Sequence, residues 1–254
     1  MPMPQDDELD PESADGRDGE AIVYTYEFIF PDGSRKNFQV SLDYDTLNIQ
    51  NEPRAGYPPW IALEFHQCPN CPLTPRQSPH CPVAKAMVHL TDFFKDIPAQ
   101  DNVLVQVRSK LRTISKEAPL QKGLSALMGL VMASSGCPIL GRMKPMVETH
   151  LPFANADETI YRFLAMYLVA QYFAYRRGEP ADWDLEELIA YFEEVRMVNV
   201  SFCRRLKDID HEGATIRAVA LLEDMADFTG FLIQSDELGR LENIFNTSMQ
   251  RPQR

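Results

Sequence analysis

Four cysteines in this 254-residue chain are each followed directly by a proline. They are Cys68, Cys71, Cys81 and Cys137. Because proline suits the first turn of a helix, each sulfur is expected where free backbone N–H groups and the helix dipole favour a thiolate. Four thiolates brought together satisfy the ligand requirements of zinc or of an iron-sulfur cluster. The pattern therefore predicts a metal or cluster site held by these four residues.

The spacing of the cysteines is compatible with either cofactor. Cys68 and Cys71 are separated by two residues, which lets both sulfurs bind one tetrahedral ion. Cys81 precedes an expected helix, and Cys137 comes from a helix junction much later in the chain, where it would connect two parts of the fold. Zinc would make the site structural and redox-silent, whereas a 4Fe-4S cluster would imply electron transfer or sensing. We expect the cluster in preference to zinc because apolar residues and prolines surround the cysteines. The competing interpretation is that buried cysteines act as small hydrophobic residues.

Histidines offer further candidates for chemistry. His66 and His80 flank the cysteines and could replace one of them as a ligand, although an outer hydrogen-bonding role is more common for such residues. His150 precedes a long helix and could serve as a general base, with Glu148 or Glu158 orienting it. A histidine at such a position more often caps a helix or forms a hydrogen bond within the core.

The first part of the chain reads as a small antiparallel sheet with two helices. Alternating apolar residues on both sides of a Pro-Asp-Gly-Ser turn predict a β-hairpin over residues 22–42. Residues 60–65 and 103–114 are the other expected strands. Helical spacing predicts one helix from residue 82 to just before residue 98 and a second over residues 120–134.

The last hundred or so residues (151–254) read as helical throughout. Asn155 followed by Glu158 resembles a capping box, and the wide apolar face behind it predicts a central helix. Asp182 or Asp184 is expected to cap the next helix, and two more helices follow. We therefore predict an α+β protein in three parts: an acidic tail over 1–20, an α+β Cys-rich region over 21–150, and a helical bundle over 151–254.

The charge and composition of the chain argue against several classes of function. The net charge is −12, and the first twenty residues hold eight acids against one arginine, as expected of a solvated tail. No basic excess predicts a nucleic-acid partner, and no stretch is apolar enough to predict a membrane span or secretory signal. We therefore expect a cytoplasmic protein. Five cysteines in a reducing compartment argue against disulfides, and the fifth, Cys203, is assigned to the core.

The motifs together resemble those of an uncharacterised bacterial family, a domain of unknown function. They are CPNCPL from Cys68, CPVA from Cys81, SGCP ending at Pro138, and HLPFA from His150. The resemblance runs from about Tyr24 to the last helix. It implies a bacterial cytoplasmic setting and brings no activity, substrate or cofactor.

The sequence therefore predicts a metal- or iron-sulfur-binding regulatory or binding protein, in preference to an enzyme. One alternative is a redox or metal-dependent enzyme that uses the cysteine site together with His150 and Glu158. Another is a structural zinc protein whose helical bundle binds a protein partner. The sequence does not determine the oligomeric state.

Overall fold

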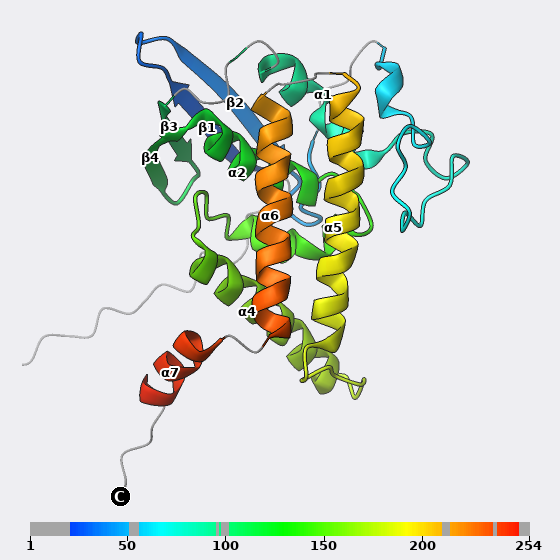
Figure 1. Ribbon diagram of the computed structural model, residues 1–254, viewed down its shortest axis with the longest axis vertical. Helices are drawn as coiled ribbons and strands as arrows, with labels where there is room; N and C mark the ends of the chain where they lie inside the picture. Colours follow the sequence, from blue (N-terminus) through cyan, green and yellow to red (C-terminus); the bar gives the residue numbers. More distant parts are fainter. Residues whose placement is uncertain are drawn as a thin grey trace, which may run out of the picture.

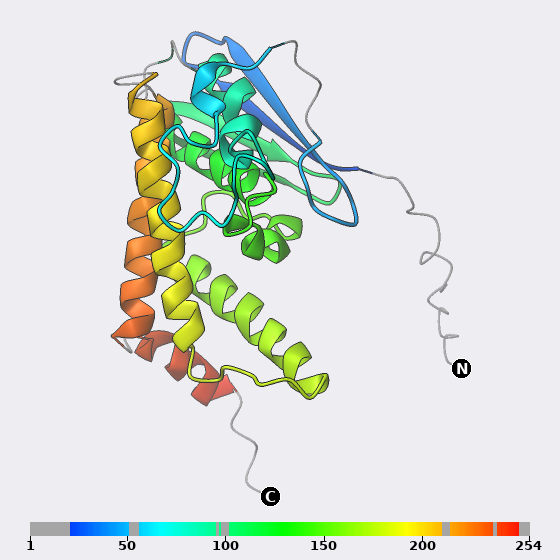
Figure 2. The same cartoon turned by 90° about the vertical axis from the view of Figure 1, so that its right-hand side faces the viewer.

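The structure is a computed structural model that describes residues 21–50, 56–94, 97, 102–209, 214–235 and 238–248. The predicted acidic tail over residues 1–20 lies outside the described residues. The fold is α+β, as predicted: a four-stranded antiparallel sheet is covered on one face by helices, with the long C-terminal helices beyond them (Figures 1 and 2).

The sheet has the order β2-β1-β3-β4. The predicted hairpin is confirmed as β1 (Ile22–Ile29) and β2 (Arg35–Leu42). The single strand expected over 103–114 is wrong: β3 (Asn102–Arg108) and β4 (Thr113–Pro119) form a second hairpin. Its turn is closed by the Ser109 N–H, which donates to the Arg112 carbonyl at 2.9 Å. Neither glycine nor proline marks this turn, so periodicity alone did not reveal it.

The strand expected over residues 60–65 is also wrong. A short 3-10 helix, η1 (Pro59–Ile61), and a series of turns occupy this segment, although Trp60 and Ile61 are buried as strand residues would be. Prolines 58 and 59 lack N–H donors for a sheet ladder, which explains the irregular backbone. One isolated bridge between Ala62 and His80 connects the segment to the residues just before Cys81.

The inner face of the sheet carries large apolar side chains against α1 (Pro82–Phe94) and α2 (Leu120–Ala133). Tyr26 and Phe28 of β1 are completely buried there. On the other face, Glu27 accepts hydrogen bonds from Arg35 and Arg108, each at 3.0 Å, across two neighbouring strands. The alternation predicted for β1 therefore separates a core face from a charged face.

Two short elements connect α2 to the C-terminal helices. Gly136, at φ +87°, follows α2 and leads into η2 (Leu140–Met143) and α3 (Lys144–Glu148). The helices α4 (Ala156–Arg176), α5 (Glu186–Lys207), α6 (Ala214–Gln234) and α7 (Gly239–Ser248) follow. Figure 1 shows α5 and α6 running side by side along the molecule. One hydrophobic core continues from the sheet through α1 and α2 into α5 and α6.

The start of α4 is as predicted, but its place in the fold is not. Asn155 and Glu158 form the capping box, with Oδ1 of Asn155 2.9 Å from the Glu158 N–H and Oε2 of Glu158 2.7 Å from the Asn155 N–H. The helix is peripheral, because Val169 and Phe173 are each 52% exposed. The continuous core of α2, α5 and α6 occupies the centre, so only a narrow stripe of α4 is covered. Asp182 caps α5 by accepting from the Glu187 N–H at 2.9 Å.

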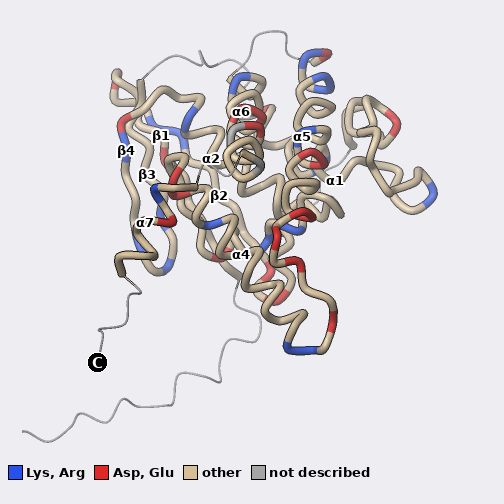
Figure 3. The backbone as a smooth tube through the Cα atoms, turned by 60° about the horizontal axis from the view of Figure 1, so that its bottom comes forward, with Lys and Arg blue, Asp and Glu red and all other residues tan. Residues whose placement is uncertain are grey.

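Charged residues are distributed along the whole described backbone. Figure 3 shows Lys and Arg interspersed with Asp and Glu on the sheet and on the helices. Within the described parts of the chain, none of the helices combines the length and apolar character required to cross a membrane.

Candidate functional site

All four Cys-Pro cysteines line one small cavity of about 20 Å3. Cys68 and Cys71 lie in the loop before α1, where the Cys71 N–H donates to the Cys68 carbonyl at 3.0 Å and closes a tight turn. Cys81 comes from the start of α1 and Cys137 from the junction between α2 and η2. The structure therefore brings together residues that the chain separates by up to about seventy positions.

The local geometry of Cys81 and Cys137 agrees with the prediction from the prolines. The Cys81 carbonyl accepts from the Lys85 N–H at 2.9 Å, so Cys81 immediately precedes the first turn of α1. The Cys137 carbonyl accepts from the Gly141 N–H at 2.8 Å, which opens the next helical turn. Both residues consequently stand directly before a helical turn, and the Cys137 sulfur accepts hydrogen bonds from the backbone N–H groups of Ile139 and Leu140.

Burial opposes ionisation of these thiols. It raises the pKa of Cys68 to about 12, and the Ser201 hydroxyl opposes this shift by hydrogen bonding to the sulfur. Burial also raises the pKa of Cys137, while the backbone N–H groups of Leu140 and Ile139 favour its thiolate. The site thus supplies hydrogen-bond donors to sulfur in a location where an isolated thiolate would be costly.

A buried arginine lies beside the cysteines. Arg205 of α5 lines the same cavity, is only 2% exposed, and donates to the backbone carbonyls of Trp60, Ala62 and Leu63. Burial lowers its pKa and the neighbouring Cys81 raises it, but a guanidinium remains charged at neutral pH. No Asp or Glu of the described residues pairs with it or lines the cavity.

The remaining lining of the cavity is largely apolar. Leu73, Val83, Ile139, Val198 and Phe202 surround the sulfurs. Such a shell limits water access, which suits a structural metal and also a redox cluster.

The two flanking histidines differ in position. His66 lines the cavity, and its Nε2 lies 2.7 Å from Oδ2 of Asp208. This contact fixes the orientation of the imidazole, as is typical of a residue that supports metal ligands through hydrogen bonds. His80 is not among the residues around the cavity, and its ring lies 5.6 Å from that of Tyr57.

The chemistry of the donors fits a thiolate-bound cofactor. Four cysteines line one cavity, no Asp or Glu is among its described lining residues, and a guanidinium lies there to offset negative charge. As they stand, however, the described residues contain no group of three or more His, Cys, Asp or Glu side chains placed to hold a metal ion. The role of the four cysteines as ligands therefore stays a prediction.

His150 and Glu158 do not form the acid–base pair that the sequence offered. The Tyr26 hydroxyl lies 2.5 Å from Nε2 of His150, and the Glu158 carboxylate accepts from the Asn155 N–H in the capping box. Burial lowers the pKa of His150 to about 3, so its imidazole is neutral at neutral pH. His150 lines a second, larger cavity of about 480 Å3.

Comparison with known families gives one match. The model of a family described as a domain of unknown function, DUF6901, matches residues 23–246. The chain belongs to this family. Comparisons with curated proteins and with solved structures found no match. Membership confirms the resemblance to an uncharacterised domain family, and the matched range covers every cysteine of the cavity.

Sequence reasoning missed two residues of the site, Arg205 and Ser201. Arg205 lies three positions after Phe202 and directly before Leu206, both of which are buried apolar residues of α5. The only indication in the sequence that Arg205 is buried was its position between these apolar residues. Because the adjacent Arg204 is exposed, the two arginines together resembled a charged, solvent-exposed part of the helix. Cys203 is buried outside the cavity, as its assignment to the core predicted.

Proposed function

We propose that this protein is a cytoplasmic regulatory or binding protein that holds a metal ion or an iron-sulfur cluster on Cys68, Cys71, Cys81 and Cys137. The observation that supports this most strongly is that four cysteines from three segments of the chain line one cavity together with Arg205. Four thiolates around a dication leave two negative charges, of which the buried guanidinium of Arg205 would offset one. Among the described residues lining the cavity, no carboxylate accompanies this guanidinium.

The positions of the ligands suggest a regulatory role. The cavity touches the loop before α1, the start of α1, the junction after α2, and α5. A bound cofactor would tie these segments together, so its occupancy or oxidation state would set how the sheet half packs on α5. Binding of metal to such a site contributes directly to folding free energy.

The two cofactors would supply different chemistry. A 4Fe-4S cluster supplies one-electron redox change or sensing, and the apolar shell and all-thiolate donor set favour it. Zinc supplies structural cross-linking without redox change, and the small volume of the cavity suits a single ion.

The first experiment is metal analysis of protein purified without oxygen. We expect about four iron and four sulfide per chain and brown protein for the cluster, or one zinc and no colour for the alternative. A folded, metal-free protein that takes up neither iron and sulfide nor zinc on reconstitution would refute the proposal.

A matched pair of cysteine variants tests the assigned ligands. Cys137→Ser should lower metal content strongly, because it removes a ligand while leaving a similar volume. Cys203→Ser changes a buried cysteine outside the cavity and should retain the metal of the wild type. Equal loss in both variants would show that the decrease reflects unfolding and not ligation.

A second candidate function is a structural zinc protein whose helical part binds another protein. The observation that favours it is the exposed aromatic face of α4, where Tyr172 and Phe173 are 48% and 52% exposed. In that case Phe173→Asp should abolish co-purification of a stoichiometric partner from native cells without altering metal content. Unchanged recovery of the same partner would count against this candidate.

A further inference from the structure

The larger cavity is lined by parts of the fold distant from one another in sequence. It lies between α2, the segment from η2 to the start of α4, and helices α5 and α6, and its volume is about 480 Å3. This is within the range of pockets that hold small organic ligands. Along α2, Ala126 and Gly129 face the cavity and leave space that larger residues would fill.

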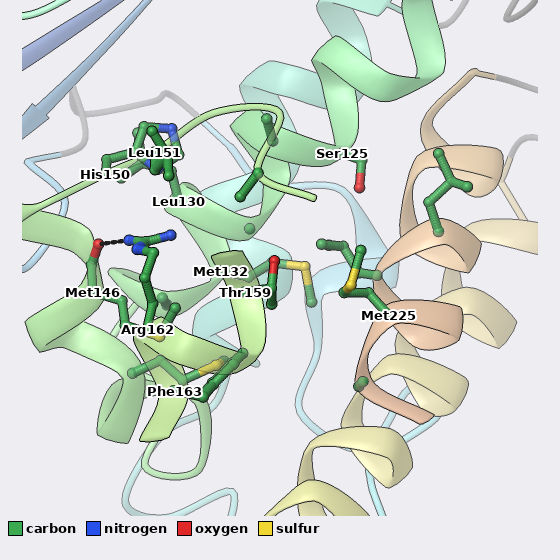
Figure 4. Close-up of a pocket in the computed structure, with 18 of the residues that line it drawn as sticks. Ser125, Leu130, Met132, Met146, His150, Leu151, Thr159, Arg162, Phe163 and Met225 are labelled. Atoms are coloured by element: carbon green, nitrogen blue, oxygen red, sulfur yellow. Dashed lines mark hydrogen bonds between the residues drawn. The ribbon is translucent and has the colours of Figure 1, made fainter. Parts of the chain in front are cut away.

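The walls of the cavity are mostly apolar and flexible. Four methionines line it, together with leucine, valine and phenylalanine side chains. Figure 4 shows Met132, Met225 and Phe163 around the open space, with Arg162 and His150 on the side away from Met225. Methionine side chains adapt readily to the shape of an apolar ligand.

The charged groups of the cavity all have one sign. Lys116, Lys122 and Arg162 line it, and none of its described lining residues is acidic. The chain as a whole has 37 acids and 25 lysines and arginines, so this local excess of positive charge runs against the overall composition. The two lysines are exposed and Arg162 is half-buried, so the positive charge extends from the surface of the protein into the cavity. This distribution favours an anionic group in the ligand.

At the end of the cavity formed by Arg162 and His150, several N–H groups can donate further hydrogen bonds. Nη2 of Arg162 donates to the Met146 and Thr149 carbonyls, while the described residues offer no acceptor to its Nη1 and Nε. The buried Tyr26 hydroxyl has no other acceptor among those residues, so it donates to Nε2 of His150. The proton of the neutral imidazole then lies on Nδ1, which also lacks a protein acceptor in the described structure. Together these groups can receive a carboxylate.

A polar side chain of α5 adds to the lining. Asn199 lines the cavity and is 3% exposed. Its amide can exchange hydrogen bonds with a polar group of a ligand.

We propose that this cavity binds a small amphipathic carboxylate, with its carboxylate on Arg162 and its apolar body among the methionines. The inference goes beyond the proposed metal site and does not depend on it. None of the four cysteines lines this cavity.

The test is isothermal titration calorimetry of the full chain with sodium decanoate, below the concentration at which it forms micelles. We expect saturable binding at one site per chain. Decyltrimethylammonium, with the same apolar chain and the opposite charge, should bind much more weakly. Absence of decanoate binding, or equal binding of both compounds, would overturn the proposal.

Variants locate the binding site. Arg162→Gln should weaken decanoate binding by about tenfold or more, since a charge-assisted hydrogen bond is lost. Arg176→Gln makes the same change at an exposed position on α4, outside the cavity, and should leave affinity unchanged.

Ala126→Trp should abolish binding by filling the cavity. If that variant does not fold, Met225→Trp fills the cavity from α6. Wild-type affinity in Arg162→Gln, or in a folded cavity-filling variant, would show that decanoate binds elsewhere.

Discussion

Replacement of Arg205 by methionine tests the centre of the proposed site. Methionine keeps most of the aliphatic volume but removes the charge and the donors to the carbonyls of Trp60, Ala62 and Leu63. Hydrogen bonds from a charged donor contribute about 1.5–3 kcal/mol each. The bond to Leu63 is 3.4 Å long and adds little, so the two others give an expected loss of about 4 kcal/mol. For a domain of this size, that corresponds to a decrease in Tm of roughly 10 °C.

The matched control is the neighbouring residue. Arg204 is exposed on the same turn of α5, so Arg204→Met should change Tm by no more than a degree or two. Differential scanning calorimetry of both variants gives the comparison. Equal Tm values for the two variants would refute the argument that Arg205 holds the loop before α1 onto α5.

Metal content separates the role of charge from the role of hydrogen bonding. Arg205→Lys keeps a positive charge but loses the forked donor geometry, whereas Arg205→Met loses both. If the guanidinium offsets the charge of a thiolate-bound cofactor, the lysine variant should retain more metal per chain than the methionine variant. Full metal content in Arg205→Met would contradict this electrostatic role and leave only the structural one.

Three further predictions concern the scaffold. Gly123→Ala should destabilise the fold by about 1–3 kcal/mol, because the new Cβ would lie 2.9 Å from side-chain atoms of Phe28 and Val105; denaturant titration measures the loss. Asn155→Ala should cost about 1 kcal/mol in the same assay through loss of the α4 capping box, and an unchanged midpoint would contradict this. His150 has its pKa lowered to about 3 by burial, so the unfolded chain takes up a proton below about pH 6.5 that the folded chain does not, and stability falls as pH decreases from there. His150→Gln should reduce the fall in Tm between about pH 7 and about pH 5, and an identical slope in both proteins would refute this assignment.

Much of the local structure follows from the sequence because its determinants are local. Alternation around a Pro-Asp-Gly-Ser turn was sufficient for the β1–β2 hairpin, and the spacing of Asn155 and Glu158 was sufficient for the start of α4. The errors arose where local patterns were ambiguous. Burial of Trp60 and Ile61 resembled a strand, although Pro59 prevents a regular ladder there. The apolar breadth of α4 resembled a central helix, although that helix lies at the periphery.

The sequence by itself determined the chemical nature of the candidate metal site: four cysteines, each placed by a proline beside the start of a turn. Only the tertiary structure decided which other groups meet them. The loop before α1 and the buried flank of α5 are more than a hundred residues apart, and no local periodicity encodes their contact. Arg205 therefore looked like surface charge in the sequence and is a buried guanidinium beside four thiols in the fold. The larger cavity has the same origin, because its lining comes from helices whose packing, and not whose individual sequences, leaves the space open.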